Sequence, residues 1–206
     1  MGWKGDDSAS GRIFGNVVDT LIRQAPCELV VVKWGSFGGN LRRNVSPILP
    51  GDLTLGNDSK LDGNYGDNSD YEPLDLGWHR WLVPIRSDPK QAAAMKLLPA
   101  LVSLSDRPEI RLCQVFDKSV NKLDTHTIEL GAKILGRRIG TEVITTLVCS
   151  GSVPEAIIDL ASKNQCDVVV VGASREGFLT QVVNGNIPEA IARGCDCTVI
   201  LVRSVN

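Results

Sequence analysis

The chain has 206 residues and a formal net charge of -2, with 43% hydrophobic and 22% charged residues. These totals are ordinary for a globular protein, and the lack of a basic surplus argues against nucleic acid or an anionic lipid surface as a partner. No apolar run approaches the roughly 18 residues that a membrane-spanning helix requires. The N-terminus also lacks the apolar core of a signal peptide, so we expect a cytoplasmic protein.

The chain opens with a glycine-containing loop, an amphipathic helix and an apolar strand over residues 28–33. A loop of this kind usually follows a β-strand, but no strand precedes it in the sequence. Residues 36–77 are rich in Gly, Asn, Asp and Ser and contain few large apolar residues. Such a segment cannot bury enough surface to offset the entropy lost on ordering it, so we predict a flexible linker.

Residues 78–206 alternate between short apolar runs and amphipathic segments. The expected strands are 81–85, 110–116, 142–148, 168–171 and 198–202, and the expected helices are 87–104, 127–138, 152–164 and 186–193. This alternation favours right-handed crossovers, so we predict an α/β domain with an open parallel sheet of five strands. Pro99 predicts a kink or an early stop in the first of these helices. Ser152 and Glu155 predict a capping box at the start of the third.

The six cysteines do not indicate disulfides. Cys113, Cys149 and Cys166 lie in or beside apolar strand-like runs, and we interpret them as small buried hydrophobic residues in a reducing compartment. Cys195 and Cys197 form a C-x-C pair, for which zinc would need further ligands, while the chain holds only two histidines. We therefore predict no metal site and interpret the pair as residues that enter a strand.

The first segment recurs near the C-terminus when it is shifted by 170 positions, without a gap. The matched residues are Gly2 with Gly172, Gly15-Asn16 with Gly185-Asn186, Asp19 with Glu189, Arg23 with Arg193, and Cys27 with Cys197. The apolar run 28–33 falls on 198–203. We therefore predict that residues 1–35 correspond to the last third of a domain like 78–206, in a tandem repeat whose first copy is truncated. The alternative is a chance similarity between two amphipathic helix–strand units.

The loop that begins at Gly172 combines features that suit an anion. Its sequence is Gly172-Ala-Ser174-Arg175-Glu-Gly177, and Gly185-Asn186 follows just before a helix. The backbone N–H groups of such a loop and the positive end of the helix can hold phosphate, at the sheet edge where ligands of parallel sheets bind. Ser174 can donate a hydrogen bond, and Arg175 can pair with phosphate charge. The alternative, which the loop alone slightly favours, is a turn that only needs glycine.

The motif Gly-x-x-Gly-x9-Gly-Ser/Thr, followed by a helix, a cysteine and a hydrophobic strand, resembles the universal stress protein (UspA) superfamily. Residues 2–33 match its glycine spacing, with Asn16 in place of Ser or Thr, and residues 78–206 resemble a whole domain from "LVPI" to "VVVVG" and "TVILVR". The resemblance implies a five-stranded parallel sheet in the order 3-2-1-4-5 with helices on both faces, preceded here by a helix–strand remnant. It also implies a stress-response or regulatory role and, in many members, ATP bound with its phosphates in the glycine loop.

The nucleotide site that this resemblance implies, for ATP or ADP, draws on strand ends and the glycine loop. Its candidate residues are Pro84, Ile85, Arg86, Asp88, Val115, Gly172, Ser174, Arg175, Gly177, Gly185 and Asn186. Arg86 stands where ATP binders of the family usually carry an acidic residue, although Asp88 is close, and Arg175 replaces the second glycine. Asn186 keeps the N-cap role, because asparagine caps a helix as well as serine does. No metal ligand set accompanies the site.

The family commonly dimerises through its final strand, an apolar edge whose free N–H and C=O groups seek a partner. This chain holds two such strands, 29–32 and 199–202, which can pair with each other in one chain or between two copies. The paired domains and the truncated start also resemble the cytoplasmic tails of some membrane transporters. A transporter is therefore a candidate partner, beside a second copy of the chain.

We expect a regulatory, ligand-sensing module rather than an enzyme. The chain has no Ser-His-Asp order, Walker lysine motif or carboxylate pair, and we interpret His126 as a solvated residue at a helix start. Two alternatives stay open: an interaction or dimerisation domain with a non-binding site, which Arg86 and Arg175 favour, and a slow ATP hydrolase. We interpret the tryptophans as packing anchors rather than base-stacking platforms; they are Trp3, Trp34, Trp78 and Trp81.

Overall fold

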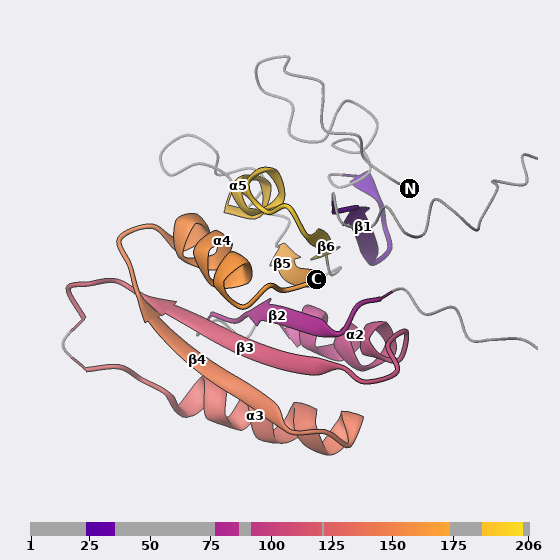
Figure 1. The fold of residues 1–206 in the computed structure, drawn as a ribbon, viewed down its shortest axis with the longest axis horizontal. Coiled ribbons are helices and arrows are strands. Elements are labelled where there is room, and N and C mark those ends of the chain that lie inside the picture. The colour runs from indigo at the N-terminus through magenta and orange to yellow at the C-terminus, as the bar shows by residue number, and fades with distance from the viewer. Residues whose placement is uncertain (1–23, 36–76, 87–91, 121, 174–186, 204–206) are drawn as a thin grey trace, which may run out of the picture.

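The computed structural model describes residues 24–35, 77–86, 92–120, 122–173 and 187–203, and these form one sheet with helices on both faces (Figure 1). The strands are β1 Leu29–Lys33, β2 Arg80–Pro84, β3 Glu109–Phe116, β4 Val143–Cys149, β5 Val168–Ala173 and β6 Thr198–Arg203. The helices are α2 Ala92–Val102, α3 His126–Ile139, α4 Val153–Lys163 and α5 Ile187–Gly194. All five strands and four helices expected within 78–206 are present.

The strand order is β1-β6-β5-β2-β3-β4, and every pair from β6 to β4 is parallel. Without β1 this is the expected order 3-2-1-4-5, so the doubly wound α/β fold is confirmed. The expected count of five strands is wrong by one, because β1 joins the same sheet as a sixth strand. Strands β3 and β4 are added on one side of β2, and β5 and β6 on the other. The direction of winding therefore reverses between β2 and β5, which is the switch point of the topology.

Two hydrophobic layers cover the sheet, one on each face. Ile157 of α4 and Ile191 of α5 pack against Leu82, Val169 and Leu201 on one face. On the other face α2 and α3 cover side chains of the same strands that point the opposite way. Every residue of β6 is buried, and Val168 to Val171 in β5 are buried as well. The uninterrupted apolar runs of these strands therefore reflect burial on both faces.

The structure corrects three local expectations. Helix α2 continues past Pro99 to Val102, and the N–H of Ser103 donates to the carbonyl of Pro99 at 3.1 Å, so of the two effects predicted for Pro99 the early stop does not occur. The capping box is not formed: Ser152 makes no side-chain cap, and its own N–H donates to Ser150 Oγ at 3.2 Å. Cys149 is exposed rather than buried, because it ends β4 at the edge of the sheet.

The N-terminal strand β1 pairs antiparallel with β6, from Leu29 opposite Arg203 to Lys33 opposite Val199. This intrachain pairing is one of the two arrangements that the sequence predicts. The ring centroids of Trp34 and Trp78 lie 5.6 Å apart, so an aromatic contact also joins this segment to the domain. The helix expected before β1 lies outside the described residues, apart from its last residue.

The contacts around this pairing are reciprocal. Lys33 Nζ donates to the carbonyl oxygens of Cys195 and Cys197, and Arg203 Nη2 donates to those of Ala25 and Cys27. Adding 170 to 25, 27 and 33 gives 195, 197 and 203, so each donor contacts the counterparts of the other's acceptors. Val31 faces its own counterpart, Leu201, at the centre of the ladder. Such exchanged contacts are those of an isologous interface around a two-fold axis.

Trp78 and Trp81 are buried and act as packing anchors, as expected, whereas Trp34 is 47% exposed. Trp81 is fully buried, and its indole N–H donates to the carbonyl of Trp78 at 2.8 Å. Trp3 lies outside the described residues.

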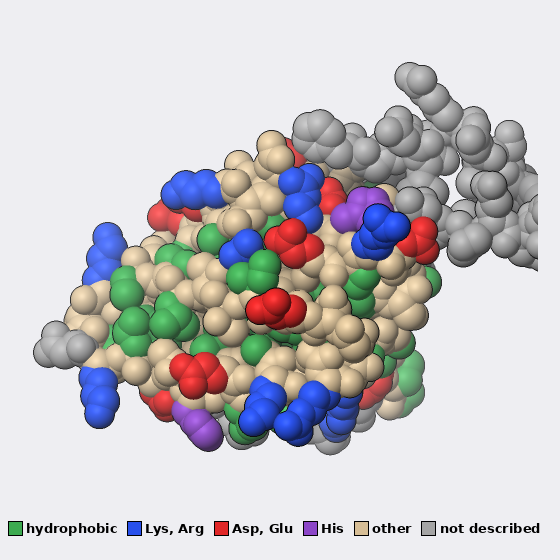
Figure 2. All heavy atoms as spheres, turned by 60° about the horizontal axis from the view of Figure 1, so that its bottom comes forward, with side chains coloured by type: hydrophobic (Ala, Val, Ile, Leu, Met, Phe, Trp, Pro, Cys, Tyr) green, Lys and Arg blue, Asp and Glu red, His purple; other side chains and the backbone are tan. Residues whose placement is uncertain are grey.

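On the face drawn in Figure 2, basic and acidic side chains are interspersed, so this face carries no basic stripe of the kind that follows a nucleic acid backbone. Among the described helices, none is long and apolar enough to cross a membrane.

Candidate functional site

The carboxyl ends of β2, β3 and β5 meet at one edge of the sheet and bring together the described members of the predicted nucleotide site. Pro84 ends β2, Val115 lies near the end of β3, and Gly172 lies near the end of β5. Ile85 is buried and extends the β2–β3 ladder, because its N–H donates to the carbonyl of Cys113 at 2.8 Å. Arg86 follows it and is exposed.

The ladder between β2 and β5 is short at this edge. It holds two residue pairs and stops at Leu82 opposite Val169, whereas β5 continues to Ala173 beside β6. The carboxyl end of β5 is therefore not paired with β2, its neighbour across the switch point. In open α/β sheets, ligands bind outside the carboxyl ends of the strands at such a switch point.

The remaining predicted site residues lie outside the described residues. They are Asp88, Ser174, Arg175, Gly177, Gly185 and Asn186. Gly172 belongs to β5 itself rather than to the loop, because its strand pairing with Val202 continues through Ala173. Helix α5 begins at Ile187, directly after Asn186, and the crossover from β5 to β6 points its N-terminal end at this same edge. The positive end of its dipole thus faces the predicted phosphate position.

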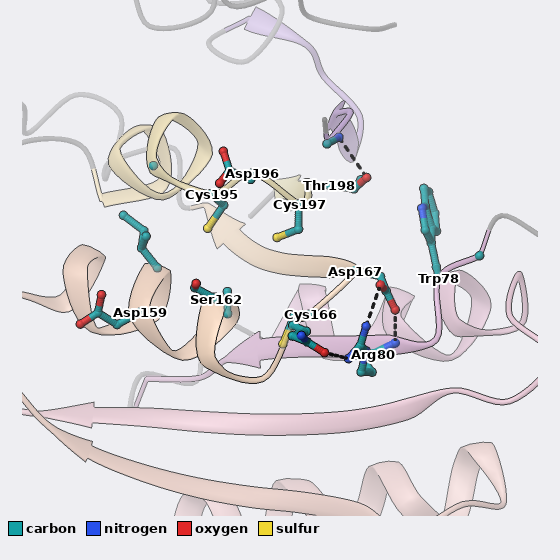
Figure 3. Close-up of a pocket in the computed structure, with 16 residues that line it drawn as sticks. Trp78, Arg80, Asp159, Ser162, Cys166, Asp167, Cys195, Asp196, Cys197 and Thr198 are labelled. Atoms are coloured by element: carbon teal, nitrogen blue, oxygen red, sulfur yellow. Dashed lines mark hydrogen bonds and ion pairs between the residues drawn. The ribbon is translucent and has the colours of Figure 1, made fainter. Parts of the chain in front are cut away.

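A cavity of about 590 Å³ lies at the opposite edge, among the amino ends of β2, β5 and β6 (Figure 3). The C-terminal ends of α4 and α5 close it on one side, and Gly35, which follows β1, lines it on another. This site is not among the predicted ones. Its only local sequence signal is the C-x-C pair, which we interpreted as residues entering a strand.

One wall of the cavity is built from ionic groups that hold the strand starts together. Asp167 Oδ2 accepts hydrogen bonds from the backbone N–H groups of His79 at 3.0 Å and Arg80 at 2.8 Å. The Arg80 guanidinium lies 3.6 Å from Asp167 Oδ1 and donates to Gln165 Oε1 at 3.0 Å. The carboxylate and the guanidinium thus already have partners, which indicates a structural role.

Three thiols from two turns form another wall. Cys195 and Cys197 point into the cavity from the turn between α5 and β6, and Cys166 lies across it at the start of β5 (Figure 3). Cys166 and Cys195 are buried, whereas Cys197 is partly exposed. No group of three or more His, Cys, Asp or Glu side chains within the described ranges is placed to hold a metal ion.

The three thiols differ in their acidity. The hydrogen bond from the Cys195 thiol lowers the pKa of Cys197, and the nearby Lys33 ammonium lowers it further, against the opposing effect of burial. The same hydrogen bond, together with burial, raises the pKa of Cys195. Burial raises the pKa of Cys166 to about 11. Cys197 is therefore the most easily ionised thiol of the three, and thiolates are the reactive form of cysteine.

Comparison with known proteins gives one family match. The model of the Universal stress protein family matches residues 78–203. No curated protein matches the chain.

Solved structures share the fold at low sequence identity. A universal stress protein from Archaeoglobus fulgidus DSM 4304 matches with a TM-score of 0.62 and 14% identity, over 100% of this chain and 60% of that one. A functionally unknown protein from Pseudomonas aeruginosa PAO1 matches with a TM-score of 0.51 and 13% identity, over 99% and 62%. This chain thus spans less than two thirds of the length of either. A universal stress protein in complex with cAMP matches with a TM-score of 0.47 and 18% identity, over 62% of this chain and 98% of that one.

Proposed function

The chain belongs to the universal stress protein family, and on this premise we propose that it is a regulatory module that binds ATP or ADP at the carboxyl edge of its sheet. The observation that carries the proposal is the switch point, where β2 and β5 stop pairing at Val169 while β5 continues to Gly172 and Ala173. A glycine there lets a ligand approach the strand end closely. The loop sequence that follows Gly172 offers backbone N–H groups to phosphate.

The residues at the carboxyl ends of β2, β3 and β5 offer apolar surface for the base of a nucleotide and positive charge for its phosphates. Pro84 and Val115 are half-buried and present apolar surface on which a base can rest. Helix α5 begins beyond the loop and adds the positive end of its dipole for the phosphates. The exposed Arg86 replaces the acidic residue of typical ATP binders, so it adds positive charge where others carry negative charge. We therefore propose that affinity rises with the number of phosphates, in the order AMP, ADP, ATP.

Titration calorimetry of the full chain with AMP, ADP and ATP tests this function. We expect saturable heat with ATP and ADP, and ATP binding about tenfold weaker in Arg86→Ala, because an arginine–phosphate contact contributes about 1.5–3 kcal/mol. Arg137→Ala is the matched control, since Arg137 is an exposed arginine in the last turn of α3. The absence of heat at millimolar nucleotide would remove the proposal.

We propose binding without catalysis as the role of this site, since the sequence has no Ser-His-Asp order, no Walker lysine motif and no carboxylate pair. The competing idea is slow hydrolysis of ATP. A phosphate-release assay at saturating ATP separates the two: we expect release at the rate of the buffer alone. Release that scales with protein concentration, and disappears in a Gly172→Val variant that still folds, would establish a hydrolase instead.

A second candidate function, an interaction domain, draws support from the pairing of β1 with β6. Family members commonly dimerise through the final strand, and here that edge is covered by the chain's own β1. We propose that the chain is a pseudo-dimer in which residues 1–35 stand in for a dimer mate. The transporter partner and the cytoplasmic location stay predictions. Fractionation of cells followed by immunoblotting checks the second, and co-purification with an intact transporter checks the first.

A further inference from the structure

The thiol-lined cavity lies at the sheet edge opposite the proposed nucleotide site, and the proposed function makes no use of it. Its volume of about 590 Å³ is enough to hold a molecule of tripeptide size. Cys197 is the thiol that such a molecule can reach, because it is partly exposed to the cavity while Cys166 and Cys195 are buried. Cys195 and Cys197 both lie in the short turn between α5 and β6, which consists of Cys195, Asp196 and Cys197.

The N-terminal segment completes this turn with a cation. Lys33, the last residue of β1, donates from Nζ to the carbonyl oxygen of Cys195 and, at 3.5 Å, to that of Cys197. Its ammonium group is therefore held at the backbone of the turn, where its charge lowers the pKa of Cys197. Two residues further on, the N–H of Gly35 donates to Thr198 Oγ1 at the start of β6, at 3.2 Å.

The pseudo-symmetric counterpart of this arrangement lacks the second thiol. Arg203 occupies the position equivalent to Lys33, and it contacts the carbonyls of Ala25 and Cys27. Ala25 stands where the complete copy has Cys195, so a pair of neighbouring thiols exists in one copy only. The two-fold packing therefore works with an alanine in the other copy, and Cys195 adds a thiol that is buried in the core beside the cavity.

We propose that the cavity is a thiol–disulfide exchange site for a low-molecular-weight disulfide such as oxidised glutathione, with Cys197 as the attacking thiol and Cys195 as the resolving thiol. A neighbouring cation and a donated hydrogen bond both favour the thiolate form of Cys197, which is the form that attacks a disulfide. The resolving thiol is Cys195, which precedes Cys197 by two residues and lines the same cavity.

The exchange balances in two steps. The Cys197 thiolate attacks one sulfur of the small disulfide, whose S–S bond breaks; one small thiolate leaves and takes a proton from water. Cys195 then loses its proton to the solvent and attacks the Cys197 sulfur, and the mixed disulfide breaks to release the second small thiol. The two protein thiols lose two electrons and two protons, and the small disulfide becomes two thiols. A disulfide between Cys195 and Cys197 closes a small ring, because only one residue separates the two cysteines. Strained disulfides are readily reduced, so the modification is reversible.

The test uses the full chain, reduced, freed of reductant, incubated with oxidised glutathione and quenched by alkylation before peptide mass mapping. We expect a Cys195–Cys197 disulfide in the wild type and a stable glutathione adduct on Cys197 in Cys195→Ser. In Cys197→Ser we expect neither product in the cavity. Cys149→Ser is the control, because Cys149 is exposed at the far edge of the sheet and should leave the disulfide unchanged.

A second pair of variants tests the role of the cation. Lys33→Met should form the disulfide roughly three- to tenfold more slowly, because a higher thiol pKa leaves less thiolate. Lys163→Met changes an exposed lysine at the end of α4 and should keep the wild-type rate. Circular dichroism melts confirm that each variant is folded. A Cys166–Cys197 disulfide, adducts confined to Cys27 and Cys149, or an unchanged rate in folded Lys33→Met would each overturn the assignment.

Discussion

At the scale of single residues, Gly35 shows how tightly the N-terminal segment packs on the domain. A Cβ atom at this position would lie 2.6 Å from the backbone carbon of Cys197 and from the backbone nitrogen of Thr198. Both neighbours are backbone atoms in a turn that leads into the buried strand β6, so neither can move cheaply. We therefore expect Gly35→Ala to destabilise the protein by about 1–3 kcal/mol.

Thermal unfolding measures the effect of Gly35→Ala, and roughly 2–4 °C of melting temperature is expected for each kcal/mol in a chain of this size. Gly151→Ala is the matched control, because an added Cβ there meets nothing within 4 Å. It should change stability by less than about 0.5 kcal/mol. Equal melting temperatures for the two variants would mean that Gly35 does not pack in solution as it does in the structure.

Burial of single thiols also makes stability depend on pH. Burial raises the pKa of Cys113 from 9.0 to about 12, with a smaller contribution from Cys166. The folded protein therefore keeps this proton in a range where the unfolded chain loses it. The free energy of unfolding is unaffected by this group below about pH 8 and falls as pH rises from about 9 to 12, by at most about 1.4 kcal/mol per pH unit.

Urea unfolding at pH 8 and pH 10, with reductant present, checks this dependence. Cys113→Ala should reduce the loss of stability between the two pH values, although its stability at pH 8 is lower because the substitution leaves a cavity. Cys149→Ala removes an exposed thiol and should keep the wild-type difference. If both variants lose stability equally with pH, the buried thiol of Cys113 is not the cause.

At the scale of elements, β1 is an edge strand that pairs with a single neighbouring strand, β6. Val31 is 8% exposed and packs in the layer with α4 and α5, while its neighbour Val30 is 40% exposed. Because alternate residues of a strand point to opposite faces, the two valines offer a matched pair in the same ladder. Val31→Asp should detach β1, because a buried unpaired charge costs several kcal/mol.

Limited proteolysis followed by mass mapping reads out this detachment. We expect residues 25–35 to be protected in the wild type and in Val30→Asp, and to be cleaved rapidly in Val31→Asp. The domain from residue 78 onward should stay protected in all three proteins at early times. Equal cleavage of the two variants would argue that β1 is not docked on β6 in solution.

At the scale of the whole molecule, the pairing of β1 with β6 decides how the chain associates. An apolar edge strand with free backbone groups seeks a partner, and β1 satisfies that edge from within the chain. We expect sedimentation to give the mass of one chain, 22.2 kDa, for the wild type. Val31→Asp opens the β6 edge and should shift the protein to dimers or larger species. A dimeric wild type that Val31→Asp converts to monomers would show that β1 is exchanged between two copies.

Sequence patterns succeeded where the physics is local. Apolar runs without alternation predicted the doubly buried strand at Val168 to Val171, and Asn164 was the expected end of α4, where it is the C-cap. They failed where a competing local partner decided the outcome. Ser150 Oγ accepts the N–H of Ser152, which a capping box would direct to Glu155. Cys149 is exposed because it ends an edge strand.

The sequence by itself determined the fold class and the strand character of residues 29–33, because both depend on periodicity within one stretch of chain. The family resemblance carried by its motifs implied the order of the five parallel strands. Only the tertiary structure decided that β1 lies in the same sheet as β6 and that Lys33 meets the turn of Cys195 and Cys197, 162 residues away from the first of them. Such contacts form because the apolar edge strand β6 has free backbone groups that another strand can pair with. A local sequence pattern predicts a strand but does not predict which edge it pairs with.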